Sequence, residues 1–285
     1  MELLQLKYFC DAAGTENLSQ TARKFQVPVS NISQTIKRLE RELGAELFSR
    51  RKNQVFLNEQ GRIFYQGAQA ALDKLEDTCL QIQDARTAVS GEIRVLALTN
   101  RRILTRAIQR FKESYPAVSF MLSHSHSAKD NEFDLIIADD HYQADGFQAK
   151  PLLREDILLA LHRSHPLAAA EQIDLSQLRN ERFITMSPGS SLHAITDSIC
   201  RGAGFAPVIV IETDDPYYVR KYLEMGLGIA FVPSLTWKGE FSDEIVLKEL
   251  SAMKRTTCVF LPDDRYLTRA VRLFAQMLSE AAETY

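Results

Sequence analysis

The segment from residue 59 to 89 constrains the fold of this chain most, because it has the pattern of one long helix with an apolar seam. It contains no proline, and its apolar side chains recur at alternating steps of four and three residues, broken only by Arg86. The seam consists of Ala68, Leu72, Leu75, Cys79, Ile82 and Val89. This spacing is typical of a heptad pattern about three repeats long. We expect Ser90–Gly91 to end the helix.

A single apolar seam cannot bury itself, so it needs a partner. It packs either on the next domain of its own chain or on a second copy. The flanking positions are rich in Gln, Glu, Asp and Lys, which favours pairing with a second copy. The residues expected to hold such a dimer together are Leu72, Leu75, Cys79 and Ile82.

Charge is distributed unevenly around this segment. The chain has 285 residues, a length that suits two or three domains. Its net charge of −3 argues against nucleic-acid binding over the whole surface. Residues 1–62, however, hold ten Lys or Arg against seven Asp or Glu, whereas the remainder holds 24 against 30. The basic residues concentrate at Lys37–Arg41 and Arg50–Lys52, which indicates that the N-terminal part meets a polyanion.

Cysteine usage and hydropathy predict a cytoplasmic protein. The four cysteines, Cys10, Cys79, Cys200 and Cys258, lie far apart, with no C-x-x-C pair and no histidines at zinc-finger spacing. We interpret them as reduced core thiols and expect no metal and no cofactor. No run of about 18 apolar residues predicts a membrane span, and the first residues lack the pattern of a secretion signal.

Residues 1–58 predict short helices followed by a hairpin. Leu3–Ala13 has helical apolar spacing, and Asn17 is a suitable N-cap for the segment 18–25. The next helix has an expected buried stripe of Val29, Ile32, Ile36, Leu39 and Leu43. The stretch "ELFSRRKNQVFLNEQG" then predicts a basic hairpin. Two helices joined by a short turn and followed by a basic hairpin are typical of a winged helix-turn-helix.

The other face of that helix has short polar groups at its start, cations one turn later, and no acid before Glu40. Ser, Asn and Gln can pair with base edges in the major groove, and Lys and Arg reach phosphates. The alternative is a solvated face that happens to lack acids. The predicted DNA-binding residues are Ser19, Gln20, Val29, Ser30, Asn31, Ser33, Gln34, Lys37, Arg38, Arg50, Arg51, Lys52 and Asn53.

Residues 92–285 alternate strand and helix patterns, which predicts an α/β fold with mainly parallel sheets. This length is enough for two small lobes. A chain that crosses between two lobes and returns leaves a cleft, where small ligands usually bind. We expect lobe I to comprise about 91–152 plus 263–285, and lobe II about 153–262.

Several motifs in order resemble the LysR-type transcriptional regulators over nearly the whole chain. They are "LKYFCDAA" at 6–13, "LSQTARKFQV" at 18–27, "SNISQTIKRLERELGAELFSR" at 30–50, "LNEQG" at 57–61, "YPAV" at 115–118, "DLIIA" at 134–138, "HPLA" at 165–168, "GSSL" at 189–192, "AGF" at 203–205 and "MGLGIAFVP" at 225–233. The resemblance implies an all-α winged helix-turn-helix at 1–58, a dimerising linker helix at 59–90, and a two-lobed α/β effector domain at 91–285 like periplasmic binding proteins. It also implies a homodimer or, more usually, a homotetramer that binds double-stranded DNA at an inverted-repeat promoter site under the control of a small-molecule effector.

The chain departs from the family pattern at its DNA-reading positions. Similar proteins usually carry Ser-Gln-Pro or Ser-Gln-Ser where this chain has Pro28-Val29-Ser30. Val29 can make only apolar contacts, such as with a thymine methyl group. An Arg that is common in the wing is Asn53 here, and the turn position that is often Gly is Gln26. We therefore expect a recognised DNA sequence that differs from that of typical relatives.

Two predicted loops supply candidate effector-binding residues: Thr99, Asn100, Ser187, Gly189, Ser190 and Ser191. Each loop follows a strand and precedes a helix, where free backbone N–H groups and hydroxyls favour an anion. We expect a small polar or anionic metabolite there. Simple N-capping is the equally weighted alternative, and relatives usually have about two more residues near Thr99. Asp214, Asp215 and Tyr217 begin a further helix and lie in the same cleft or merely cap that helix.

Two other protein classes fit less well. An enzyme is disfavoured because the chain has no G-x-S-x-G, H-E-x-x-H or P-loop motif. His124 and His126 could form a metal pair, but no third ligand stands at useful spacing, and a surface loop is the preferred interpretation. A transport solute-binding protein would need export and would lack the DNA-binding region.

Overall fold

The computed structural model describes residues 1–51, 54–84 and 88–284 of the chain. These residues form two compact units, Met1–Arg86 and Thr87–Tyr285. No helix in the described ranges is long and apolar enough to cross a membrane.

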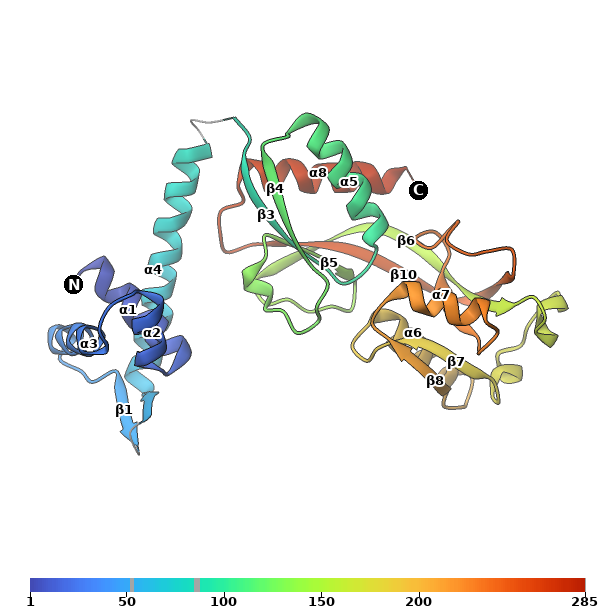
Figure 1. The fold of residues 1–285 in the computed structure, drawn as a ribbon, viewed down its shortest axis with the longest axis horizontal. Coiled ribbons are helices and arrows are strands. Elements are labelled where there is room, and N and C mark those ends of the chain that lie inside the picture. The colour runs from blue at the N-terminus through green and yellow to red at the C-terminus, as the bar shows by residue number, and fades with distance from the viewer. Residues whose placement is uncertain (52–53, 85–87, 285) are drawn as a thin grey trace. The chain divides into compact units, whose positions relative to one another are not determined.

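The first unit consists of helices, one hairpin and a long helix (Figure 1). Its elements are α1 (Leu3–Thr15), α2 (Leu18–Lys24), α3 (Val29–Leu43), β1 (Phe48–Arg51), β2 (Gln54–Leu57) and α4 (Glu59–Asp84). Asn17 caps α2, because its side chain accepts hydrogen bonds from the backbone N–H groups of Ser19 and Gln20. The turn between α2 and α3 places Gln26 in the left-handed region at φ 55°. This arrangement confirms the predicted winged helix-turn-helix.

Helix α3 buries only the middle of its predicted apolar stripe. Ile32 and Leu39 are fully buried and Ile36 nearly so, whereas Val29 and Leu43 are 44% and 39% exposed. The prediction of a stripe buried along its whole length is therefore wrong at both ends. The reason is that Val29 is the first residue of the helix and Leu43 the last, so both lie beyond the surface that packs on α1 and α2.

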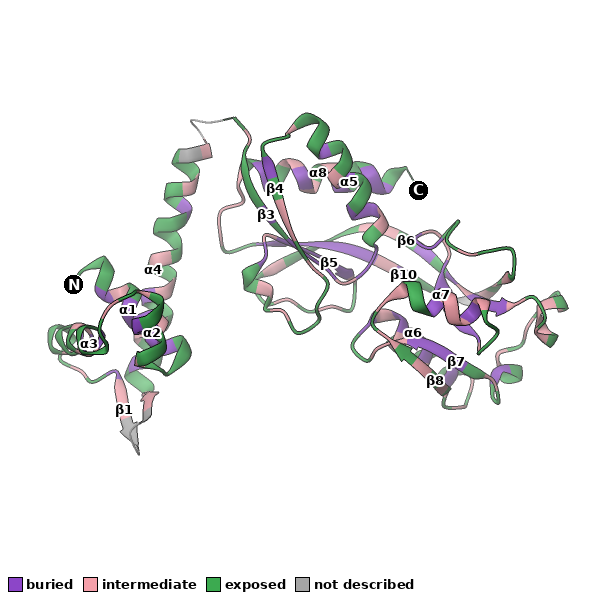
Figure 2. Cartoon of the chain, in the orientation of Figure 1, coloured by how far each residue is buried: buried purple, intermediate pink, exposed green. Residues whose placement is uncertain are grey.

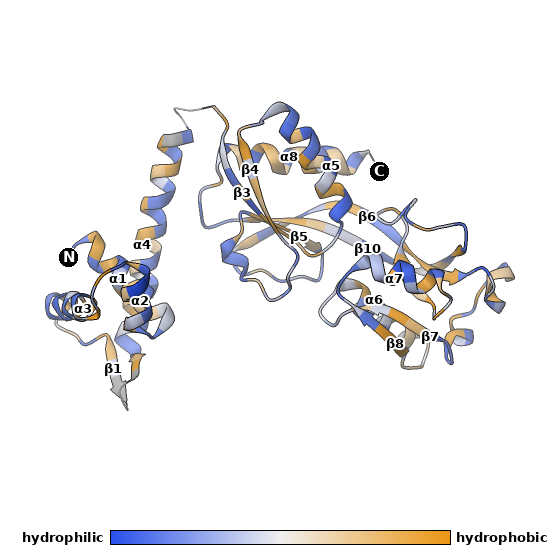
Figure 3. Cartoon of the chain, viewed as in Figure 1, coloured by the Kyte–Doolittle hydropathy of each residue, from blue (hydrophilic) through white to orange (hydrophobic). Residues whose placement is uncertain are grey.

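Helix α4 is mostly exposed along its length (Figure 2) and has apolar positions between polar ones (Figure 3). Its start is fixed by Asn58, whose Oδ1 accepts from Gly61 N at 2.7 Å. A Cβ on Gly61 would lie 2.1 Å from the carbonyl oxygen of Leu47, so only glycine fits there. The prediction that the helix extends to Ser90 is wrong, because Ala88 and Val89 are not helical. Val89 instead packs on the core of the second unit.

The second unit begins with a strand–helix–strand unit and contains two long strands further along the chain. Its elements in chain order are β3 (Gly91–Ala97), α5 (Arg101–Ser114), β4 (Val118–Ser123), β5 (Leu135–Asp139), β6 (Phe147–His162), β7 (Arg182–Met186), α6 (Ser191–Gly202), β8 (Val208–Thr213), α7 (Pro216–Glu224), β9 (Ala230–Pro233), β10 (Ile245–Pro262) and α8 (Arg269–Glu283). Three short 3-10 turns at Asp130–Glu132, Pro166–Ala169 and Leu175–Leu178 lie between them.

The large sheet of this unit has the strand order β4-β3-β5-β10-β6-β9. Strand β3 pairs in parallel with β4 and β5, but β10 runs antiparallel to both β5 and β6, and β6 runs antiparallel to β9. The expectation of mainly parallel sheets is therefore wrong for the large sheet, although β7 and β8 pair in parallel. The reason is that β6 and β10 cross the unit in opposite directions, so they pair antiparallel.

Two separate apolar cores flank the crossing strands. One contains β3, β5, α5 and α8, with Phe111 and Phe274 fully buried. The other contains β7, β9, α6 and α7, with Phe183 and Leu223 fully buried. Strands β6 and β10 contribute to both cores, and this makes the unit two-lobed. The α/β fold with two lobes is confirmed, while the exact lobe boundaries stay a prediction.

Candidate functional site

The solvent-facing side of α3 carries the predicted DNA-contacting groups. Ser30, Asn31, Gln34, Lys37 and Arg38 are exposed, and Ser33 is half-buried. No acid occurs in the first turn of the helix. Ser19 and Gln20 at the start of α2 are exposed as well. This face presents donors, acceptors and two cations to solvent.

A single acid couples this helix to the hairpin. Glu40 Oε1 accepts hydrogen bonds from Leu47 N at 2.8 Å and from Phe48 N at 3.4 Å, and so holds the start of β1 against α3. The sequence interpretation noted Glu40 only as the first acid of the helix and missed this role. Of Arg50 and Arg51 only the backbone is described, and Lys52 and Asn53 lie outside the described residues.

The predicted dimer seam faces solvent within the first unit. Leu75 and Ile82 are 52% and 53% exposed, Cys79 is exposed and Leu72 is half-buried. Ala68, one turn earlier, is buried against Phe9 and Leu47 in the unit's own core. The seam therefore splits: its start packs within the chain, and the remainder is an uncovered apolar face of that unit.

The second unit contains a cavity of about 660 Å³. Five of the six predicted effector-binding residues line it: Thr99, Asn100, Ser187, Ser190 and Ser191. Gly189, at φ 91°, is not among the lining residues and has no side chain to contribute. Asp214, Asp215 and Tyr217 also line the cavity.

Both predicted loops act as helix N-caps within this cavity. Asn100 is held in the left-handed region, and its Oδ1 accepts from Ile103 N at 3.3 Å at the start of α5. Ser190 Oγ accepts from His193 N at 3.2 Å at the start of α6. Capping and cavity lining are therefore not alternatives, since the same side chains do both. Thr99, Asn100 and Ser190 are each less than a tenth exposed.

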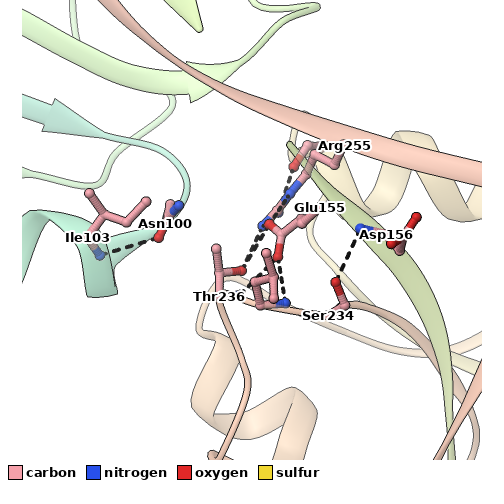
Figure 4. Close-up of polar contacts among 9 residues, drawn as sticks. Asn100, Ile103, Glu155, Asp156, Ser234, Thr236 and Arg255 are labelled. Atoms are coloured by element: carbon pink, nitrogen blue, oxygen red, sulfur yellow. Dashed lines mark hydrogen bonds and ion pairs between the residues drawn. The ribbon is translucent and has the colours of Figure 1, made fainter. Parts of the chain in front are cut away.

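A buried ion pair lies on the two crossing strands at the cavity. Arg255 on β10 donates through Nη2 and Nε to Glu155 Oε1 on β6, at 2.6 and 3.2 Å (Figure 4). The other carboxylate oxygen of Glu155 accepts from the backbone N–H groups of Leu235 and Thr236, at 3.0 and 2.9 Å. Sequence reasoning missed this pair, because its members stand 100 residues apart and look like ordinary surface charges.

The outer wall of the cavity combines charged and aromatic groups that the sequence did not single out. Arg220 lies over the ring of Trp237, 5.2 Å from its centroid, and 3.7 Å from Glu240. Asp215 Oδ1 accepts from Tyr217 N at 2.9 Å and so caps α7. The capping alternative for Asp215 is thus present alongside its place in the cavity.

The histidines of the "SHSHS" segment also line this cavity. His124 Nδ1 lies 2.8 Å from the carbonyl oxygen of Ala97, which can only accept, so the neutral ring carries its proton on Nδ1. Burial lowers the pKa of His126, against the opposing effect of Asp139. Within the described residues, the one group that could hold a metal is Asp139, Asp140 and His141, which is mostly exposed.

The buried thiols are chemically inert in this environment. Burial, assisted by Asp73, raises the pKa of Cys10 to about 11, and burial with Asp197 raises that of Cys200 to about 11. Such thiols stay protonated at neutral pH and are poor nucleophiles. Cys79 on α4 is exposed.

Together these features define a DNA-binding regulator with a separate ligand-binding domain. Residues 3–62 match the model of the bacterial regulatory helix-turn-helix proteins of the lysR family, and residues 86–283 match that of the LysR substrate binding domain. The chain belongs to the LysR family of transcriptional regulators, which bind DNA and small-molecule effectors and form oligomers, and it is not an enzyme.

Individual relatives agree with this assignment. The chain is 28% identical over 290 residues to the transcriptional dual regulator GltC of Bacillus subtilis (strain 168), covering 98% of this chain and 96% of GltC. A full-length OxyR variant from Pseudomonas aeruginosa has a similar structure, with a TM-score of 0.69 at 21% identity over 99% of this chain and 95% of that one. Full-length CbnR solved with its target DNA has a TM-score of 0.59 at 20% identity, covering 99% of this chain and all of CbnR.

Proposed function

We propose that α3 reads an inverted-repeat promoter site in the major groove while the β1–β2 hairpin follows the phosphate backbone. Ser30, Asn31 and Gln34 pair with base edges, and Val29 packs on an apolar group such as a thymine methyl. Lys37 and Arg38 contact phosphates and set the position of the helix. This proposal rests chiefly on the exposed, acid-free face of α3 in a chain of this family.

The proposal extends to assembly through α4. An exposed apolar face of Leu75, Cys79 and Ile82 on a helix of 26 residues is suited to pairing with a second copy. Pairing would present two copies of α3 to the two halves of an inverted repeat. We propose a homodimer as the DNA-binding unit and a homotetramer as the complete assembly.

In this proposal the effector occupies the cavity of the second unit, where Thr99, Asn100, Ser187, Ser190 and Ser191 contact it. The cavity is lined from both lobes, so a ligand that touches both stabilises one relative arrangement of them. It can shift that equilibrium only by the difference in its affinity for the two arrangements. Because its target is chromosomal DNA, we place the protein in the cytoplasm.

The decisive experiment maps where the purified full-length protein binds genomic DNA, and then footprints a recovered site with wild-type protein and with Gln34→Ala. The proposal requires a protected inverted repeat and a relaxed base preference in the variant. Protection without any sequence preference, or an unchanged preference in Gln34→Ala, would contradict the assignment of α3.

A further inference from the structure

One buried donor on the α5 side of the cavity lacks an acceptor. Asn100 is 7% exposed, its Oδ1 is engaged in capping α5, and its Nδ2 has no hydrogen-bond partner among the described residues. A buried N–H group without an acceptor costs free energy, so such groups are rare in native structures. Asn100 lines the cavity, and a ligand acceptor there would satisfy it.

A second set of donors lies at the start of α6 and on β10. Ser190 Oγ accepts from His193 N, which leaves its hydroxyl hydrogen available to donate. Arg255 uses Nε and Nη2 for Glu155 and Thr236, but its Nη1 makes only a 3.4 Å contact with Ser191 Oγ in the described part of the chain. Arg255 is 4% exposed and lines the cavity.

The N-termini of α5 and α6 are electrostatically alike, and the N-terminus of α7 differs from them. Helices α5 and α6 have neutral caps, Asn100 and Ser190, and no acid in the first turn. Helix α7 is instead capped by Asp215, with Asp214 directly before it in the chain. Because a helix N-terminus attracts negative charge, α5 and α6 can each receive an anion, whereas α7 already has carboxylates at its start.

We propose that the effector is a doubly anionic small acid. One anionic group accepts from Asn100 Nδ2 at the start of α5. The other accepts from the Ser190 and Ser191 hydroxyls and Arg255 Nη1. Asn100 stands at the start of α5 and Arg255 on β10 (Figure 4), while Ser190 and Ser191 stand at the start of α6. A singly charged acid with no second acceptor would leave one set unmet, and the positive N-terminus of the helix at each set favours an anion over a neutral acceptor. The inference rests on the proposed function of the cavity.

The test compares diacids with their own half-esters on the full-length chain. The probes are malonate, succinate, glutarate and adipate, with phosphonoacetate as the carboxylate–phosphonate arm, and the monomethyl ester of each dicarboxylate as its singly charged match. Binding is measured by thermal shift and calorimetry. At least one doubly anionic probe is expected to bind about tenfold or more tighter than its half-ester, because a charge-assisted hydrogen bond is lost in the ester.

Two variants locate the binding. Asn100→Ala removes the first donor together with the α5 cap, and Ser191→Ala removes one of the two hydroxyls of the second set and leaves the α6 cap in place. Each substitution is expected to weaken the binding of the diacid about 10- to 100-fold. Asn180→Ala and Ser279→Ala, which change exposed residues outside the cavity, serve as matched controls and should bind like wild type.

Three outcomes overturn the inference. No doubly anionic probe binds at millimolar concentration, or the half-esters bind as tightly as the diacids, or both variants bind the diacid as tightly as wild type does. If a singly charged or neutral compound binds and both variants weaken it, the double charge is wrong but the proposed cavity stands. If compounds bind and neither variant responds, the proposed cavity itself is wrong. DNA binding by the same preparations reports separately on α3.

Discussion

The α3 surface and the cavity of the second unit carry similar polar side chains in opposite surroundings. On α3 the polar groups are exposed, so they are available to a large, rigid and charged ligand. In the cavity Asn100, Ser190 and Arg255 are almost fully buried and already cap helices or form an ion pair. The first surface is therefore expected to tolerate substitution without loss of stability, whereas the second combines binding with folding.

The sharpest test of this contrast is two ion pairs between neighbouring positions of the same strands. Glu155–Arg255 is buried, with side chains 0% and 4% exposed, whereas Asp156–Lys254 is exposed at 59% and 54%. Glu155→Ala leaves a buried guanidinium unpaired and should lower the free energy of unfolding by about 3–5 kcal/mol. Asp156→Ala should cost less than about 1 kcal/mol.

Urea unfolding of both variants measures this difference. Equal losses of unfolding free energy would mean that burial does not make the Glu155–Arg255 pair more important for stability than the exposed pair. The expected contrast between buried and exposed polar groups would then be wrong for these pairs. A wild-type far-UV CD spectrum for Asp156→Ala controls for general damage to the strands.

The next effect concerns the uncovered face of α4. Leu75→Asp places a charge in the paired seam and should separate the dimer, with binding to an inverted repeat weakened about 100-fold or more as two-site binding is lost. Light scattering and footprinting measure both consequences. Glu76→Gln, at an adjacent exposed position, is the control. A variant with wild-type mass and wild-type DNA affinity would mean that Leu75 does not lie at the interface.

On α3 the expected losses are in binding alone. Gln34→Ala should weaken specific binding by about 1–3 kcal/mol and relax one base position. Lys37→Ala should weaken binding to all DNA and reduce the salt dependence by about one unit. Titrations at several salt concentrations distinguish them, and each variant controls for the other. Unchanged affinity and specificity in both would remove α3 as the reading helix.

The smallest effect is expected for Thr99, whose hydroxyl lines the cavity outside the two proposed donor sets. Thr99→Ala should weaken the response to a confirmed effector by about 0.5–1.5 kcal/mol and leave DNA affinity without effector nearly unchanged. Ser190→Ala should weaken the response more, because Ser190 belongs to a proposed donor set, and should also lower stability by about 0.5–2 kcal/mol, since it removes the α6 cap. Footprinting with effector and thermal unfolding separate these losses. An effector that acts equally on both variants would place its site elsewhere.

Much of the DNA-binding unit was predictable from the sequence, because its signals are local. Helical spacing, the Asn17 cap and the acid-free face of α3 all occur within a few turns of chain, and family motifs reinforced them. The errors occurred at the ends of elements. Val29 and Leu43 have the right spacing for burial, but the stripe extends beyond the surface that covers it.

For the cavity of the second unit, some lining residues were predictable from the sequence and others were not. Thr99, Asn100, Ser187, Ser190 and Ser191 were predictable, because strand ends and helix starts have local signatures. Arg255, Thr236 and Trp237 were not, since strands from distant parts of the chain bring them to the same cavity.

The sequence by itself determined the helices of the DNA-binding domain, the strand–helix alternation of residues 92–285, which helix presents an acid-free face, and where the Asn17 cap stands. Only the tertiary structure decided that β6 and β10 pair antiparallel across both lobes and bring Glu155 opposite Arg255. Local patterns depend on neighbouring residues and can be read in order. The partner of a buried charge depends on the register between strands about a hundred residues apart in the chain. No local spacing in the sequence encodes that register.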